Sequence, residues 1–194
     1  MKHILSGIVI LSVVAAPAFA ALKEGDTAPD FTAQASLAGK EFTFSLHDAL
    51  KKGPVVVYFY PSAFTEGCNI QAHTFSVNKA KFTKAGADVV GVSLDNIERL
   101  NAFSKDPQYC AGKLAVASDA DGKIAKSYDL KVADAHPGFK DTRGVEIGHG
   151  FAERTTFIVT PDGKIAATVG GLAPAANVAK ALEVVQQLKA AKKK

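Results

Sequence analysis

The apolar positions of this chain fall into two patterns, short continuous runs and spaced stripes. Residues 55–60 are an unbroken run of β-branched and aromatic residues, which predicts a strand buried on both faces at the centre of a parallel or mixed sheet. Residues 68–84 are expected to form a helix, and residues 87–93 a second strand. Because such crossovers are right-handed and join parallel strands, these segments predict a βαβ unit.

Strand and helix patterns continue to alternate after this unit. Asp95 is expected to cap a helix that ends near Lys105. A short strand at residues 114–117 and a short helix at residues 123–130 follow. Residues 155–160 and 165–169 are rich in β-forming residues and are joined by a Pro-Asp-Gly turn, so they predict an antiparallel hairpin.

Three further segments complete the pattern. Residues 41–46 alternate between apolar and polar side chains, which predicts a strand in an N-terminal β extension. The last helix is expected to start near Pro174, with one apolar stripe formed by Val178, Leu182, Val185 and Leu188. Residues 131–153 lack periodicity and are rich in glycine, so they predict an irregular insertion. This insertion is either surface decoration, or a flap beside the active site or a subunit contact.

The first twenty residues have the features of a secretory signal peptide. A basic start precedes an apolar stretch at residues 4–16, and Ala18-Phe-Ala20 fits the small-x-small cleavage pattern. A membrane anchor is the competing interpretation, but the stretch is shorter than the roughly 20 residues that a bilayer span needs. We therefore expect cleavage after Ala20 and a single exported domain at residues 21–194. In a Gram-negative cell that location is the periplasm.

Composition and charge narrow the classes of function. A hydrophobic content of 47% is enough for a globular core. The net charge of +4 is too small to indicate a nucleic-acid partner, and the three lysines at residues 192–194 are most simply a solvated end. After signal cleavage no segment is long and apolar enough to predict a membrane association.

The candidate chemistry centres on Cys68, one of two cysteines. It lies between the strand at residues 55–60 and the following helix, so it is expected at a helix N-terminus, where free N–H groups and the helix dipole favour an anion. A thiolate is the reactive form of cysteine. The spacing Pro61-x-x-x-Thr65-x-x-Cys68 in this context resembles the active-site motif of the peroxiredoxins. The order of elements through residue 171 also resembles their thioredoxin-like α/β fold, with a central mixed sheet flanked by helices.

The resemblance implies a thiol peroxidase whose site residues have distinct roles. Thr65 would turn its hydroxyl toward the sulfur and the peroxide, and Pro61 would shield the sulfur without competing for hydrogen bonds. Peroxiredoxins place an arginine just before the strand beside the active helix, a position that Arg154 matches here. Arg143 is the fallback for this cation, and Arg99 is expected to be an exposed helix residue.

The second cysteine, Cys110, is the candidate resolving thiol. Attack on peroxide would convert Cys68 to a sulfenic acid, which a second thiol can condense to a disulfide. The bacterioferritin-comigratory or Q-type subgroup, which this chain most resembles, often carries the resolving cysteine at the position of His73. Other members place it near the next helix, as Cys110 does, so the resemblance implies an intramolecular Cys68–Cys110 pair. A one-cysteine cycle with an external thiol stays open.

Other interpretations of the two cysteines and the histidines remain. The pair could be a permanent structural disulfide in a periplasmic thioredoxin-like thiol–disulfide or binding protein, although the Cys-x-x-Cys dithiol is missing. A metal site is disfavoured because no histidine or cysteine pair has zinc-site spacing. We therefore expect no cofactor and no metal. The expected partners are a peroxide and a thiol reductant, such as a periplasmic thioredoxin-like protein or a low-molecular-weight thiol, in a monomer or homodimer.

Overall fold

The structure is a computed structural model that describes residues 21–191. The predicted signal peptide at residues 1–20 and the lysines at 192–194 lie outside the described residues. Among the helices of residues 21–191, none combines the length and the apolar character that crossing a bilayer requires.

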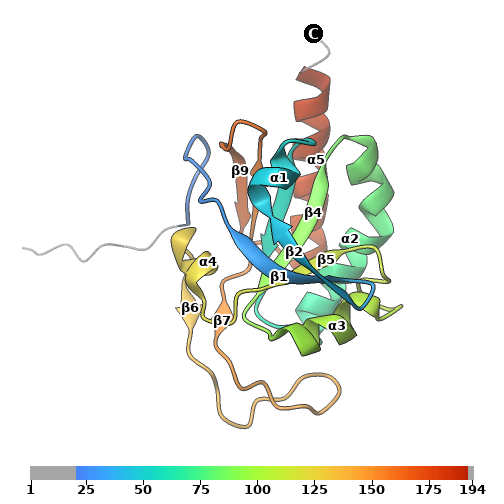
Figure 1. The fold of residues 1–194 in the computed structure, drawn as a ribbon, viewed down its shortest axis with the longest axis vertical. Helices are drawn as coiled ribbons and strands as arrows, with labels where there is room; N and C mark the ends of the chain where they lie inside the picture. The colour runs from blue at the N-terminus through green and yellow to red at the C-terminus, as the bar shows by residue number, and fades with distance from the viewer. Residues whose placement is uncertain (1–20, 192–194) are drawn as a thin grey trace, which may run out of the picture.

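A seven-stranded mixed sheet forms the centre of the molecule, with the strand order β2-β1-β5-β4-β3-β8-β9 (Figure 1). The strands β3, β4 and β5 are parallel, and every other neighbouring pair is antiparallel. The predicted mixed sheet is therefore confirmed. The strands are β1 (Thr32–Leu37), β2 (Lys40–Ser45), β3 (Val55–Phe59), β4 (Asp88–Ser93), β5 (Ala115–Ser118), β8 (Thr155–Val159) and β9 (Ile165–Gly170).

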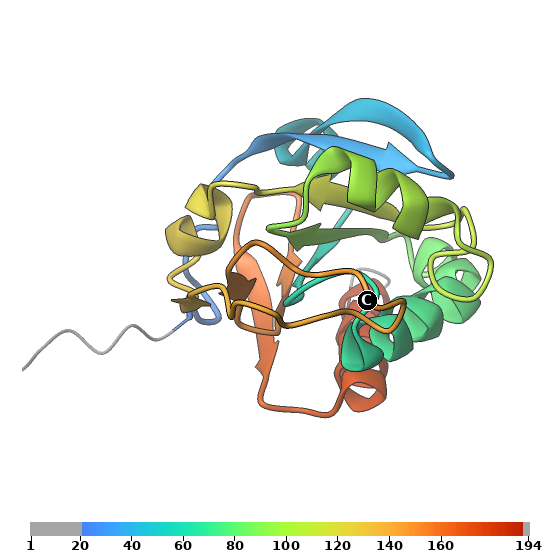
Figure 2. The same cartoon turned by 90° about the horizontal axis from the view of Figure 1, so that it is seen from below.

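Helices cover both faces of this sheet (Figures 1 and 2). Side chains of β3 alternate between two buried clusters, which explains why the whole strand is apolar. Val56 and Tyr58 pack with α2, α3 and α5, whereas Val57 and Phe59 pack with α1 and α4. The helices are α1 (Leu46–Leu50), α2 (Glu66–Lys84), α3 (Ile97–Lys105), α4 (Lys123–Ser127) and α5 (Pro174–Ala191).

The connections expected from the sequence are present. β3 and β4 are parallel, as the βαβ prediction required, and β8 pairs antiparallel with β9 across the Pro-Asp-Gly turn. The N-terminal β extension is the antiparallel pair β1 and β2. On α5, Val178 and Val185 of the predicted stripe are buried, and Leu182 and Leu188 are partly buried against the same cluster.

Two local predictions were wrong. Asp95 does not cap α3, because its carboxylate is fully buried and accepts hydrogen bonds from Ser93 and Ala63. Asn96 is the cap, and its side chain accepts from the Arg99 N–H at 2.9 Å. The helix predicted to reach residue 130 ends at Ser127, since Asp129 turns the chain with a φ of +54°.

The insertion at residues 131–153 is a loop closed by a two-stranded sheet. β6 (Val132–Ala133) pairs antiparallel with β7 (Phe151–Ala152). The chain between these strands passes beneath the sheet and beside the start of α2 (Figure 2). The Thr142 N–H donates to the Phe64 carbonyl at 3.0 Å, so the insertion contacts the loop that leads to Cys68. This contact favours the flap hypothesis over surface decoration.

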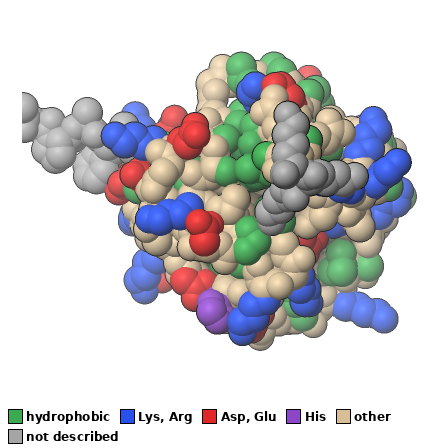
Figure 3. Space-filling view, turned by 90° about the horizontal axis from the view of Figure 1, so that it is seen from above, with side chains coloured by type: hydrophobic (Ala, Val, Ile, Leu, Met, Phe, Trp, Pro, Cys, Tyr) green, Lys and Arg blue, Asp and Glu red, His purple; other side chains and the backbone are tan. Residues whose placement is uncertain are grey.

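The face opposite the insertion has a mixed surface charge. Lys and Arg side chains lie around its edge, with Asp and Glu side chains beside several of them (Figure 3). This face therefore presents no uniform charge of one sign, in keeping with the small net charge of +4.

Candidate active site

Cys68 lies in the first turn of α2 and is 1% exposed. Thr65 is the N-cap, and the first intrahelical bond runs from the Asn69 N–H to the Thr65 carbonyl at 2.8 Å. The N–H groups of residues 66–68 therefore precede the helical hydrogen-bond ladder. Together with the helix dipole they create a positive environment for the Cys68 sulfur.

The loop between β3 and α2 is held by its own side chains. The Thr65 hydroxyl donates to the Ser62 carbonyl at 2.9 Å, and no side-chain cap bond is made by Thr65. Its proton is thus directed into the loop rather than toward the sulfur, which differs from the prediction, while its lone pairs stay available as acceptors. Pro61 is half-buried and lies two residues beyond the end of β3 at Phe59.

Arg154 lies beside the sulfur. Its Nη2 is 3.4 Å from Cys68 Sγ, and its Nη1 donates to Gln71 Oε1. Arg154 directly precedes β8, whose first residue pairs with the last residue of β3, so antiparallel pairing brings it to the start of the Cys68 loop. Gly67 leaves room for the guanidinium, because a Cβ there would lie 3.1 Å from Arg154 Nη2.

A buried chain of polar groups orients this guanidinium. Gln71 Nε2 donates to Asn177 Oδ1 at 3.1 Å, and Thr156 Oγ1 donates to the same oxygen at 2.6 Å. Asn177 Nδ2 donates in turn to the Val169 carbonyl at 2.9 Å. None of these three side chains was predicted from the sequence. The available signal was a polar residue among apolar positions, in the predicted helices for Gln71 and Asn177 and in the predicted strand for Thr156.

The other two arginines have structural partners. Arg143 donates to Asp141 Oδ2 from Nε and Nη2 and lies over the Phe64 ring, so it does not serve as the fallback cation. The prediction that Arg99 is exposed was wrong, because its side chain is only 12% exposed and lies 2.8 Å from both Asp95 and Asp141. These buried carboxylates require a nearby cation.

His149 of the insertion, which is partly buried, forms an ion pair with the buried Asp95. Its Nε2 lies 2.9 Å from Asp95 Oδ1, and its Nδ1 lies 2.7 Å from the Gly150 carbonyl. Both ring nitrogens face acceptors, and only the imidazolium can donate from both. Burial opposes the charged form, but the hydrogen bond and charge of Asp95 raise the pKa of His149 above its ordinary value. Burial likewise opposes the Asp95 carboxylate, but His149 lowers the pKa of Asp95.

Cys110 is a fully buried free thiol in the same apolar cluster as Cys68, which is also free. Burial raises the pKa of Cys110 far above its ordinary value. The loop that carries it is tied to α2, because His73 Nδ1 lies 2.9 Å from the Gln108 carbonyl. His73, at the position where Q-type members often carry the resolving cysteine, thus contacts the segment that carries Cys110.

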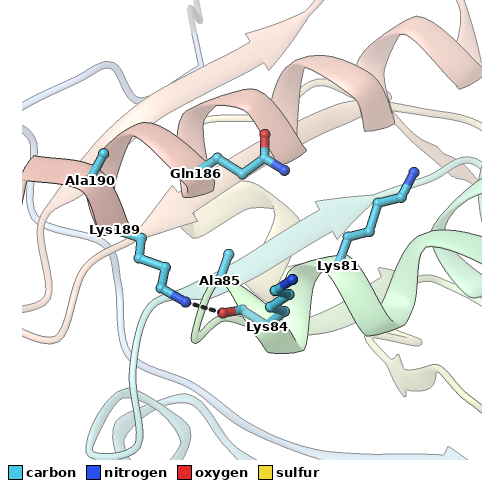
Figure 4. A pocket seen from close by; sticks show the side chains of 6 residues that line it. All are labelled: Lys81, Lys84, Ala85, Gln186, Lys189 and Ala190. Carbon is cyan, nitrogen blue, oxygen red and sulfur yellow. Dashed lines mark hydrogen bonds between the residues drawn. The ribbon is translucent and has the colours of Figure 1, made fainter.

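A cavity of about 410 Å³ lies between the C-terminal turns of α2 and α5 (Figure 4). It is lined by Lys81, Lys84, Ala85, Gln186, Lys189 and Ala190. Lys84 follows Cys68 by 16 helical residues, or about 24 Å along the axis, so this cavity is separate from the candidate site. Within residues 21–191, no three His, Cys, Asp or Glu side chains are grouped as a metal site would need.

Comparison with known proteins identifies the class. The AhpC/TSA family matches residues 24–168, so the chain belongs to this family, the peroxiredoxins. Its relatives include the chloroplastic peroxiredoxin Q of Sedum lineare, 38% identical over 112 residues, which are 58% of this chain and 56% of that protein. Peroxiredoxin Bcp of Escherichia coli K12 is 31% identical over 144 residues, which are 74% of this chain and 83% of that protein.

The fold also resembles that of solved peroxiredoxin structures. The crystal structure of peroxidoxin BcpB from Mycobacterium tuberculosis superposes with a TM-score of 0.71 and 27% identity, over 86% of this chain and 97% of that one. This similarity confirms the thioredoxin-like peroxiredoxin fold that the sequence predicts. The matched region spans little more than half the length of the Sedum lineare relative, at 56%.

Proposed function

We propose that this protein is a thiol peroxidase that reduces hydrogen peroxide, and also organic hydroperoxides, through Cys68. The single observation that carries the proposal is the Arg154 guanidinium 3.4 Å from the Cys68 sulfur, at the first turn of a helix. A permanent planar cation and free N–H groups stabilise a thiolate there without any added group. Membership of the peroxiredoxin family supports the same activity.

The reaction follows from these groups. The Cys68 thiolate attacks the terminal oxygen of the peroxide, the O–O bond breaks, and the departing oxygen takes up a proton as water or an alcohol. Cys68 is left as a sulfenic acid. Arg154 and the N–H groups of residues 66–68 stabilise the negative charge that moves from sulfur to the departing oxygen. Thr65 orients the peroxide by accepting a hydrogen bond from its proton.

Cys110 is the proposed resolving residue. Its thiol condenses with the sulfenic acid, releasing water and forming a Cys68–Cys110 disulfide, which an external thiol then reduces. Two observations support this pairing. Both cysteines belong to the same buried apolar cluster, and both are free thiols. Because Cys110 is fully buried, its loop must move before the two sulfurs meet. The alternative, a structural disulfide, predicts that neither cysteine is consumed by peroxide.

We place the mature protein, residues 21–194, in the periplasm, where the reductant is a thioredoxin-like protein or a low-molecular-weight thiol. Signal peptidase is proposed to cleave after Ala20. The proposed active unit is a monomer or homodimer. N-terminal sequencing of the exported protein and sedimentation of the mature form measure these two properties directly.

Rapid mixing of the reduced protein with hydrogen peroxide, with products read by mass, tests the activity. The wild type is expected to consume one equivalent and to lose two hydrogens as the disulfide forms. Cys110→Ser is expected to react once and stop as a sulfenic or over-oxidised Cys68, because no second thiol can condense with it. Cys68→Ser is the control and is expected to leave peroxide unconsumed. A wild-type protein that stops at a sulfenic Cys68 without losing two hydrogens would contradict the pairing.

A further inference from the structure

Phe64, four residues before Cys68, has a backbone conformation that a bulky residue rarely adopts. Its φ is +62°, and its side chain is 1% exposed. A left-handed conformation is strained for a non-glycine residue, so it persists only where surrounding contacts fix it. Phe64 directly precedes the N-cap Thr65, and its conformation therefore sets the direction in which α2 begins.

The hydrogen bonds that fix the backbone of Phe64 come from the insertion. Its carbonyl accepts from the Thr142 N–H at 3.0 Å and from the Thr142 hydroxyl at 2.8 Å. The same hydroxyl oxygen accepts from Asn69 Nδ2 at 3.4 Å. Thr142 thus links Phe64, four residues before Cys68, to Asn69, the residue that immediately follows Cys68. One exposed side chain spans both sides of the reactive sulfur in the sequence.

The Phe64 ring is held from the same segment. The Arg143 guanidinium lies over this ring, 3.3 Å from its centroid, and is fixed in that place by Asp141. Arg99 of α3 also lies over the ring, 5.6 Å from its centroid, and Phe103 and Tyr109 contact it edge-to-face at centroid distances of 5.0 and 5.9 Å. A cation stacked on an aromatic ring is attracted to the electron-rich face of the ring, and this attraction helps to offset the strain of the backbone.

Asp141 links the insertion to the loop between β3 and α2 through a second set of contacts. Its Oδ2 lies 2.8 Å from Arg99 Nη2, and the same nitrogen donates to the Ala63 carbonyl at 2.8 Å. Asp141 Oδ1 accepts from the N–H groups of Arg143 and Val145. Three consecutive residues, 141–143, therefore act on residues 63 and 64 through a carboxylate, a hydroxyl and a guanidinium.

We propose that Thr142 and Arg143 are positioning residues for Cys68. They balance the strain at Phe64 and so hold the start of α2 in the orientation that places Cys68 Sγ beside Arg154. Without them Phe64 relaxes to a negative φ, the N-cap rotates, and the sulfur moves away from the cation and the N–H groups. The inference rests on the proposed peroxidase function for its rate effect, but the orientation of Cys68 can be measured without peroxide.

The test compares Thr142→Val, which keeps the shape and loses the hydroxyl, with Thr142→Ser, which keeps the hydroxyl. Thr83→Val, at an exposed threonine near the end of α2, is the matched control. Two measurements are made on each: the single-turnover rate with hydrogen peroxide, and the pH profile of Cys68 alkylation by iodoacetamide in a Cys110→Ser background. Thermal unfolding is followed alongside.

Thr142→Val is expected to slow peroxide reduction about tenfold to 100-fold, the effect of a small misplacement of a reacting atom. It should also shift the alkylation profile toward higher pH, while Thr142→Ser and Thr83→Val behave like the wild type. A shift of the profile distinguishes positioning from a merely structural role. Arg143→Gln, at a side chain that is 38% exposed, should give the same direction of change and serves if Thr142→Val does not fold.

Wild-type rates and an unchanged alkylation profile in both Thr142→Val and Arg143→Gln would overturn the inference. If the wild type itself leaves peroxide unconsumed, the proposed function fails, yet the alkylation profiles still decide whether Thr142 and Arg143 position Cys68. A loss of thermal stability in Thr142→Val with a wild-type profile would assign the contact to folding alone and would also overturn the inference.

Discussion

At Arg154, charge and shape contribute separately to the site. One nitrogen of the planar guanidinium faces Cys68 while another donates to Gln71, and an ammonium group cannot reproduce both contacts. Arg154→Lys keeps the charge and is expected to slow peroxide reduction by about 100-fold, since it removes a fixed donor to the departing oxygen. Stopped-flow single-turnover kinetics measure this effect. A lysine variant as fast as the wild type would show that charge alone suffices.

His149 makes stability depend on pH in one direction. Folding raises its pKa, so its contribution is complete below the unfolded value of about 6.5 and is lost as pH rises through the folded value. We expect His149→Gln to lower the free energy of unfolding by about 1–3 kcal/mol at about pH 6. The difference should shrink toward about pH 9. Urea unfolding of both proteins across this range tests it, and a constant difference would contradict the charged pair.

At the scale of single residues, prediction from the sequence succeeded where the order of helices and strands determines the surroundings of a side chain. The helix start at Cys68 follows from element order, whereas Arg154 was predicted from the resemblance to the peroxiredoxins. The antiparallel pairing of β8 with β3 in the structure brings the two together. Prediction failed for Asp95 and Arg99. Their burial depends on contacts with Asp141 and His149 of an insertion that has no periodicity, and sequence offers no means of docking such a loop.

At the scale of elements, α5 contributes to the site through Asn177. This amide joins Gln71 and Thr156 and also donates to the Val169 carbonyl, all buried. Asn177→Ala leaves three buried polar groups without this partner and is expected to destabilise the protein by about 2–4 kcal/mol. It should also slow peroxide reduction, because Gln71 no longer orients Arg154. Lys180→Ala, on the exposed face of α5, is the control for helix effects.

Thermal unfolding together with single-turnover kinetics separates the two parts of this prediction. A destabilised Asn177→Ala protein that still reacts at the wild-type rate would show that Arg154 is held without α5.

Most elements were predicted from sequence within one or two residues, since their apolar patterns are long. β6 and β7 were not predicted, because two-residue strands carry no periodic signal.

For the whole molecule, the two apolar clusters are built without the part of the insertion between β6 and β7. Neither buried apolar cluster includes a residue from the segment between β6 and β7. Because β6 and β7 are antiparallel neighbours, replacing residues 134–150 with an Asn-Gly turn should preserve a cooperative fold. Peroxide reduction is expected to fall at least about tenfold, as the contacts to Phe64 are lost. Circular dichroism and single-turnover rates check both results, and a shortened protein with full activity would contradict the role of the insertion.

The amide chain that reaches from Asn177 to Arg154 also has a consequence for biosynthesis. Among the described residues, the helix that supplies Asn177 is the C-terminal element, so it is synthesised after Cys68 and Arg154. Both side chains are therefore present before the amide that orients the guanidinium. We expect their arrangement to be completed only when α5 packs against β8.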